Sequence, residues 1–204
     1  MLKVALTGGI ATGKSHALEQ FRRRGVPCLD ADSLAHGVTA AGTEATSAIA
    51  ARFGSDVLAP DGSVDRARLG PIVFADAAAR QELEAIVHPA VYRAIQAGLR
   101  AFELLDPSSL AVVDIPLLFE SGHDGDFDRV IVTACPLEMQ LARLRERGMS
   151  EIEARQRLAA QWPTEEKTRR ADFVIRTDGS VEDTARQVDE VLAKLRVQVE
   201  DPGT

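Results

Sequence analysis

Cysteine is scarce in this sequence: its 204 residues include only Cys28 and Cys135. The two are not spaced as a Cys-x-x-Cys pair or as ligands of a metal ion, so the sequence gives no sign of a zinc site or a disulfide framework. Both lie in apolar, strand-like surroundings. We therefore expect two buried thiols in a reducing compartment.

Long hydrophobic runs are also missing. No apolar stretch approaches the length that spans a membrane. The first residues run directly into a strand pattern, without the basic and apolar regions of a secretory signal. These absences predict a cytoplasmic protein with no membrane partner, and we expect the tail beyond Glu200 to be frayed.

Positive charge is in deficit, with 24 Lys and Arg against 31 Asp and Glu and a formal net charge of −7. No overall basic surface argues for nucleic acid, so we expect no nucleic-acid partner. A local basic groove stays open as an alternative, because 20 of the 24 basic residues are Arg. The length suits one domain, or one core with an inserted lobe.

A glycine-rich segment follows the apolar run Val4 to Leu6 and reads Gly-Gly-Ile-Ala-Thr-Gly-Lys-Ser. This is the P-loop pattern, in which glycines let successive backbone N–H groups surround an anion. A strand pattern precedes it and a helix pattern follows, which favours a phosphate site over a chance turn. Lys14 can reach the outer phosphates and the Ser15 hydroxyl can hold Mg²⁺. The predicted nucleotide-binding residues are Gly8, Gly9, Ala11, Thr12, Gly13, Lys14, Ser15 and His16.

Five apolar segments alternate with helical patterns along much of the chain. This alternation predicts an α/β fold, a doubly wound five-stranded parallel sheet. Residues 33–105 contain no convincing strand, so we expect a helical lobe there, inserted into a core made of 1–32 and 106–204. We expect Pro71 to break a helix and Pro89 to kink or split a long one. The strand segments are centred on residues 4–6, 26–29, 110–115, 128–134 and 172–176.

Three carboxylates follow predicted strands, where such sheets bind ligands. Asp30 and Asp32 point the same way if that segment is extended, and Asp32 can accept or orient the proton of an attacking hydroxyl. The alternative is that Asp32 only caps the next helix, and the role of cap stays open for Asp30 as well. Asp114 ends the third strand, where it can hold Mg²⁺ directly or through water; a plain strand-end polar residue is the alternative.

Arginines cluster late in the chain. Arg143 and Arg147 share a helix face, and Arg155 and Arg157 follow across a Gly-Met turn. Such arginines can close over ATP as a lid, spanning about 141–168, and stabilise charge on the transferred phosphoryl group. The alternative is a solvated face paired with neighbouring glutamates.

Together these motifs resemble the dephospho-CoA kinase family over nearly the whole length. The matching stretches are LTGGIATGKS at 6–15, LDAD at 29–32, HP at 88–89, DIPLLFE at 114–120, RLRERG at 143–148 and ADFVI at 171–175. The resemblance implies a P-loop kinase core, a helical CoA-binding lobe and a lid. It implies transfer of the ATP γ-phosphate to the ribose 3′-hydroxyl of dephospho-CoA, with Mg²⁺, giving coenzyme A and ADP.

The resemblance also implies roles for single residues. Asp32 is the candidate base, and the other catalytic candidates are Lys14, Arg143 and Arg147. Substrate-binding candidates are Asp32, His88, Pro116 and Leu117, and the metal candidates are Ser15 and Asp114. The partners are then ATP and dephospho-CoA, acting on a monomer or weak homo-oligomer.

The chain departs from the family pattern in two places. The family usually has Gly-Ser-Gly-Lys-Ser-Thr, whereas Ala11, Thr12 and His16 stand here; we expect binding to survive because Gly13, Lys14 and Ser15 remain. The family often has an Asn near adenine, whereas Thr177 occupies the matching place and the chain has no Asn.

Two other functions compete with this prediction. Another P-loop kinase, with a nucleoside monophosphate or a sugar acid as acceptor, shares the same fold argument. A GTPase-like switch needs an Asn-Lys-x-Asp guanine motif, which a chain without Asn cannot contain.

Overall fold

The computed structural model describes residues 1–200. Two compact units are present: a sheet unit, formed by 1–29 with the chain from 101 onward, and a helical unit, formed by 30–100. The predicted fraying beyond Glu200 lies outside the described residues. Among the helices that the structure describes, none has the length and hydrophobicity of a transmembrane span.

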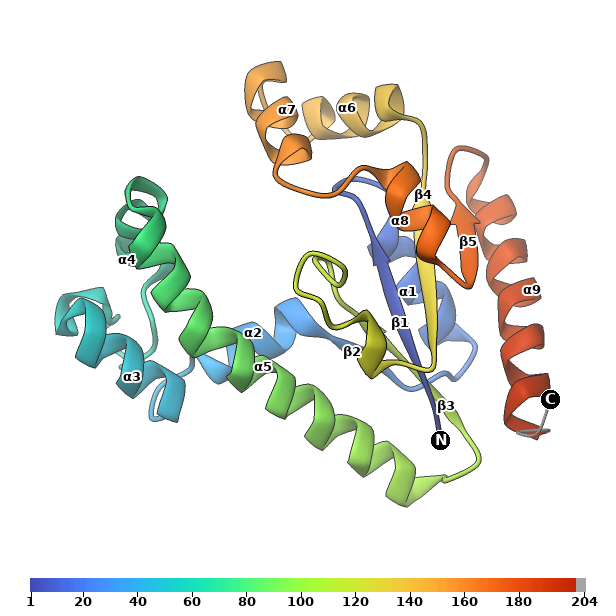
Figure 1. The fold of residues 1–204 in the computed structure, drawn as a ribbon, viewed down its shortest axis with the longest axis horizontal. Helices are drawn as coiled ribbons and strands as arrows, with labels where there is room; N and C mark the ends of the chain where they lie inside the picture. Colours follow the sequence, from blue (N-terminus) through green and yellow to red (C-terminus); the bar gives the residue numbers. More distant parts are fainter. Residues whose placement is uncertain (201–204) are drawn as a thin grey trace. The chain divides into compact units, whose positions relative to one another are not determined.

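A five-stranded sheet forms the centre of the sheet unit, in the order β2-β3-β1-β4-β5. β1 lies in the middle and runs parallel to β3 and β4, and β4 runs parallel to β5 (Figure 1). This confirms the predicted parallel α/β sheet. Strands buried on both faces read as apolar runs, as in β3. The strands are β1 (Leu2–Gly8), β2 (Cys28–Asp30), β3 (Leu110–Asp114), β4 (Arg129–Ala134) and β5 (Phe173–Arg176).

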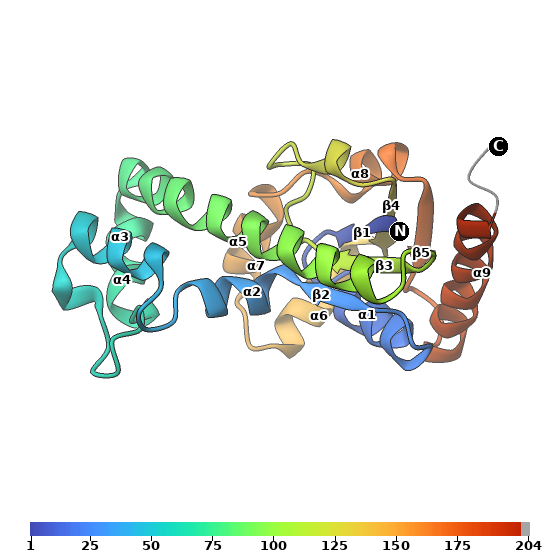
Figure 2. The ribbon, with the colours of Figure 1, turned by 90° about the horizontal axis from the view of Figure 1, so that it is seen from below.

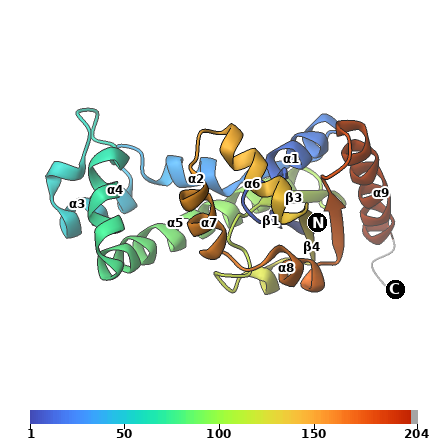
Figure 3. The same cartoon turned by 90° about the horizontal axis from the view of Figure 1, so that it is seen from above.

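Helices of the sheet unit cover both faces of this sheet. Figures 2 and 3 show α1 and α8 on opposite sides of the strands, while α9 contacts α1 and β5. Phe21 of α1 and Leu195 of α9 are fully buried in the core that joins these helices to the sheet. The helices are α1 (Lys14–Arg23), α6 (Leu137–Glu146), α7 (Glu151–Ala159), α8 (Thr164–Arg170) and α9 (Val181–Glu200), with a short 3-10 turn η2 (Asp124–Asp126).

Residues 30–100 fold around a second, smaller core. Ile49, Val57 and Leu69 are buried there, and aliphatic side chains from the following helices pack against them. The elements are α2 (Ala31–Val38), α3 (Glu44–Phe53), the 3-10 turn η1 (Ser55–Val57), α4 (Arg66–Ala75) and most of α5 (Ala77–Leu105), whose last residues belong to the sheet unit.

The prediction that Pro71 breaks a helix was wrong, because it lies inside α4. Pro89 lies inside α5, which continues through it, so the split, one of its two predicted outcomes, does not occur. A proline removes one backbone hydrogen bond from a helix and leaves the carbonyl four residues earlier without its partner. Ala67 and Ala85 carry those carbonyls and are both exposed, so water can take the place of the missing N–H.

The segment after β2 differs from its prediction. It is not extended, because α2 begins at Ala31 and places Asp32 within its first turn. Asp30 is the residue that caps this helix, its carboxylate accepting the Ser33 N–H at 3.0 Å. The premise that Asp30 and Asp32 point the same way along a strand was therefore wrong, and so was the alternative that Asp32 is the cap.

Candidate active site

The glycine-rich segment connects β1 to α1, as the motif predicts. Gly13 has φ 82°, a left-handed conformation that suits glycine, and Ala11 adopts φ 61°. A side chain at Gly8 would collide with Thr133 and would lie 2.6 Å from the Thr12 hydroxyl. The loop therefore depends on glycine at its first position because other side chains fill the space beside it.

The N-terminus of α1 is left open by its own sequence. No side chain caps it, and the residue before the helix is Gly13. Unpaired N–H groups and the positive end of the helix dipole favour an anion at this place. Thr12 is fully buried and donates to Gly9 O at 2.7 Å, so its hydroxyl shapes the loop, whereas Ser15 is exposed at the helix start.

Lys14 and Asp114 form an ion pair between their Nζ and Oδ1 atoms. Asp114 is the last residue of β3, in register with Leu6 of β1, and is 4% exposed. The structure thus brings together two predicted site residues at the carboxyl ends of neighbouring strands, where ligands bind in such sheets.

The donor chemistry of the site fits Mg²⁺. The Ser15 hydroxyl and the Asp114 carboxylate are the hard oxygen ligands that this ion prefers. Within residues 1–200, no group of three or more His, Cys, Asp and Glu side chains could hold a metal by itself. Magnesium usually takes its remaining ligands from phosphates and water, so a sparse protein donor set is what a nucleotide-bound ion needs.

The four predicted lid arginines differ in their contacts. Arg143 donates through Nη1 to Ala11 O at 3.1 Å and through Nη2 to Thr177 O at 2.6 Å. Arg155 pairs with Glu151 at 2.8 Å, as the solvated-face alternative expects. Arg147 is exposed, and its side chain has no hydrogen bond or ion pair within the described chain, so its guanidinium is available to a ligand.

Two glutamines that the motifs did not single out hold the peptide groups of Ile10. Gln140 Nε2 donates to Ile10 O at 2.7 Å, and Ile10 N donates to Gln161 Oε1 at 2.8 Å. A side chain at Gly9 would meet Gln140 at 2.9 Å. The spacing in the sequence could have indicated Gln140, because it stands one helical turn before the predicted site residue Arg143.

Trp162 anchors the chain between α7 and α8. Its backbone N–H donates to Glu120 Oε1 at 2.9 Å, and its ring stacks on Phe119 with centroids 6.1 Å apart. The Arg170 guanidinium lies over the Trp162 ring, 4.6 Å from the ring centroid. The same Glu120 forms an ion pair with fully buried Lys167 at 2.7 Å. The PLLFE stretch thus supports the segment that carries Gln161.

The remaining predicted substrate residues are divided between the sheet unit and the helical unit. Pro116 and Leu117 follow β3; Pro116 O accepts from the Thr7 hydroxyl at 3.3 Å, and Leu117 is exposed. Asp32 is an exposed residue of α2 in the helical unit, and His88 lies on α5 in the same unit.

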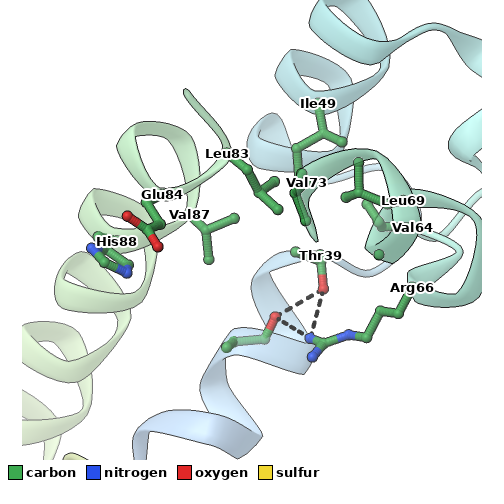
Figure 4. Close-up of a pocket in the computed structure, with 12 residues that line it drawn as sticks. Thr39, Ile49, Val64, Arg66, Leu69, Val73, Leu83, Glu84, Val87 and His88 are labelled. Carbon is green, nitrogen blue, oxygen red and sulfur yellow. Dashed lines mark hydrogen bonds between the residues drawn. The ribbon is translucent and has the colours of Figure 1, made fainter. Parts of the chain in front are cut away.

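An apolar pocket of about 310 Å³ opens in the helical unit, and His88 is one of its lining residues. Figure 4 shows Glu84 and His88 on one helix at one side and Arg66 at the other. Arg66 Nη2 donates to Ala35 O at 3.2 Å, at the C-terminal part of α2. Aliphatic side chains form the rest of the wall: Ile49, Val64, Leu69, Val73, Leu83 and Val87.

Known proteins match most of this chain in sequence and in fold. The family model for dephospho-CoA kinase matches residues 2–183. Dephospho-CoA kinase of Anaeromyxobacter dehalogenans is 46% identical, with 96% of this chain and 93% of that protein covered. Among solved structures, TT1252 from Thermus thermophilus has a TM-score of 0.79 and 36% identity, covering 95% of this chain and 97% of its own.

Dephospho-CoA kinase from Campylobacter jejuni gives a TM-score of 0.72 and 31% identity, with 96% of this chain and 97% of that chain covered. The family match and the identities over nearly full length confirm the resemblance found in the motifs. The strand–loop–helix at Gly8–Ser15, with Lys14 beside Asp114, is the local structure of one of the motifs that carry that resemblance. The chain belongs to the dephospho-CoA kinase family.

Proposed function

We propose that this protein transfers the γ-phosphate of ATP to the ribose 3′-hydroxyl of dephospho-CoA, producing coenzyme A and ADP. The supporting observation is the open P-loop between β1 and α1, with Lys14 as the first residue of α1, in a chain that matches the family over residues 2–183. Phosphoryl transfer needs positioning and charge neutralisation more than covalent chemistry, which such a loop supplies.

We assign a residue of this chain to each step of the transfer. The loop N–H groups and Lys14 hold the phosphates, and Lys14 then exchanges its contact with Asp114 for one with a phosphate oxygen. Ser15 and Asp114 would hold Mg²⁺, which neutralises charge on the phosphates. Asp32 receives the proton of the ribose hydroxyl, and Arg147 stabilises charge on the transferred group.

The helical unit is the proposed acceptor-binding lobe, and its pocket suits the pantetheine arm. α2 carries Asp32 in its first turn and the pocket residue Ala35 further along, and the pocket residue Thr39 is its C-cap. At 1.5 Å per residue, Asp32 and Thr39 stand about 10 Å apart along the helix axis. An acceptor whose hydroxyl meets Asp32 can therefore extend its pantetheine arm along α2 into the pocket.

Substitution of Asp32 tests the mechanism. We expect Asp32→Ala to lower turnover by orders of magnitude with little change in ATP affinity, because the hydroxyl loses its proton acceptor. Ser33→Ala, one residue further on the same exposed turn, is the matched control and should behave like wild type. Near-normal turnover of Asp32→Ala, measured as ADP release, would remove Asp32 from the mechanism.

Acceptor choice tests the activity itself. ADP release should be strong with dephospho-CoA and weak with nucleoside monophosphates and sugar acids. The opposite ranking would favour the alternative of another small-molecule kinase.

To test the pocket, Val87→Phe should raise KM for dephospho-CoA while leaving KM unchanged for a truncated acceptor that keeps the ribose but lacks pantetheine. Equal changes for both acceptors would contradict the pocket assignment.

A further inference from the structure

We infer that three side chains outside the P-loop, Gln140, Arg143 and Thr177, preset the loop for phosphate by turning its carbonyl groups outward. They act as positioning residues: each acts on the loop backbone, and the backbone acts on the phosphate. The inference rests on the proposed function for the identity of its substrate, ATP.

Three successive carbonyls of the loop each accept a hydrogen bond from a different side chain. Ile10 O accepts from Gln140 at 2.7 Å and Ala11 O from Arg143 at 3.1 Å. Thr12 O accepts from the Thr177 hydroxyl at 2.7 Å. Together these bonds fix three consecutive peptide groups, those with the carbonyls of residues 10 to 12. The N–H of the middle group, on Thr12, donates to Gly9 O at 3.2 Å, so the N–H groups of Ala11 and Gly13 are the ones left for an anion.

Carbonyl direction decides whether such a loop attracts or repels phosphate. An anion-binding nest forms only when consecutive N–H groups converge on one point, which requires the oxygens of the same peptide planes to face elsewhere. A peptide that rotates would present a carbonyl oxygen to the phosphate oxygens and repel them. Three external donors oppose that rotation in the segment that precedes Lys14.

The donors themselves are firmly held. Gln140 is 3% exposed and Thr177 is 5% exposed. Gln140 and Arg143 lie one turn apart on the same face of α6, so one helix supplies two of the three donors. Arg143 also donates to Thr177 Oγ1 at 3.1 Å, which joins the second donor to the third.

This role differs from the contacts predicted for the same positions. The sequence places Arg143 against the transferred phosphoryl group, and position 177 is where the family often contacts adenine. In the structure Arg143 instead donates to two backbone carbonyls, those of Ala11 and Thr177. The Thr177 hydroxyl donates to the carbonyl of Thr12. Both roles remain compatible for Arg143, so the decisive test uses Thr177.

Thr177→Val is that test, because it replaces the hydroxyl by a methyl group of nearly the same size. Affinity for inorganic tripolyphosphate with Mg²⁺ isolates the phosphate subsite, and affinity for adenosine isolates the base and sugar. We expect tripolyphosphate and ATP to bind roughly tenfold more weakly, the loss expected for one hydrogen bond that organises several others. Adenosine affinity and KM for dephospho-CoA should stay unchanged, and Thr177→Ser should restore binding.

A second variant guards against loss of fold. Gln140→Met removes the donor to Ile10 from a different element, and thermal unfolding of both variants shows whether the sheet unit is intact. Unchanged tripolyphosphate affinity in both folded variants would overturn the inference, as would an equal loss for adenosine, which indicates direct base contact. If wild type binds tripolyphosphate but fails to phosphorylate dephospho-CoA, the proposed function fails, while the comparison of variants still decides this inference.

Discussion

Burial raises the pKa of the Cys28 thiol to about 11, against a counteracting effect of Arg22. Folding therefore keeps a proton on this sulfur between its ordinary pKa of 9.0 and about 11. In that window the unfolded chain has already lost the proton, so the contribution of Cys28 to stability declines as pH rises. At neutral pH both thiols act as small apolar groups; Cys135 is buried as predicted, whereas Cys28 is only partly buried.

Alkylation by iodoacetamide measures this protonation. At pH 8 only about a thousandth of Cys28 is thiolate, so we expect modification far slower than that of a free thiol. The rate should keep rising from pH 9 to pH 11, where glutathione has levelled off. Cys28→Ala identifies the signal of Cys135, and urea-unfolded protein should react fully at both positions. A rate at pH 8 equal to that of glutathione would contradict the burial of this thiol.

Among the secondary-structure elements, α8 is tied to the chain after β3 by a buried ion pair. Lys167 Nζ has no further hydrogen-bond partner within residues 1–200, and the second oxygen of Glu120 has none either. A buried charge that loses its partner is strongly destabilising, while replacing both charges by apolar groups is often neutral. The pair therefore makes α8 sensitive to single substitutions.

Lys167→Met should lower the free energy of unfolding by about 3–5 kcal/mol, since it leaves Glu120 charged and unpaired. Glu120→Leu combined with Lys167→Met should recover part of that loss, although the acceptor for Trp162 N–H is gone. Lys194→Met, at an exposed position of α9, is the control and should change stability by less than about 0.5 kcal/mol. Urea unfolding measures these variants and Glu120→Leu alone; a loss in the double variant equal to the sum of the two single losses would argue against a coupled pair.

Some of these elements could be predicted from the sequence, and others could not. The strand–loop–helix at residues 2–23 was predictable, because glycines, Lys14 and the flanking apolar patterns are adjacent in the chain. The support of that loop was not: Gln140 and Thr177 are separated from it by 130 and 165 residues, and their roles follow from tertiary packing. The start of α2 was not predicted because both Asp30 and Asp32 can cap a helix, and the structure shows that Asp30 does so.

At the scale of the whole molecule, each of the two units has a hydrophobic cluster of its own. The main cluster of the sheet unit contains fourteen buried side chains, and the cluster beside the pocket of the helical unit contains three. A small core with an open pocket has less apolar burial to resist local unfolding. We expect the helical unit to be the less stable of the two.

Hydrogen exchange tests this difference. Ile49→Ala removes a fully buried side chain from the helical unit and should lower the opening free energy of amides in 30–100 by about 2–5 kcal/mol. Amides of β1 and β4 should change little. Leu18→Ala in the sheet unit should have its largest effect on the strands instead. A uniform increase in exchange across both units in Ile49→Ala would show that they unfold together.

Ala11 joins the loop to the rest of the sheet unit in a way that glycine would not. Its left-handed backbone is unfavourable for alanine, yet its methyl group is buried with Leu141 and Leu144 of α6 and Ala154 of α7. Packing thus compensates for an awkward conformation and couples two helices to one methyl group. The backbone at Ala11 therefore takes up its curvature when the protein folds, before any triphosphate binds to the loop.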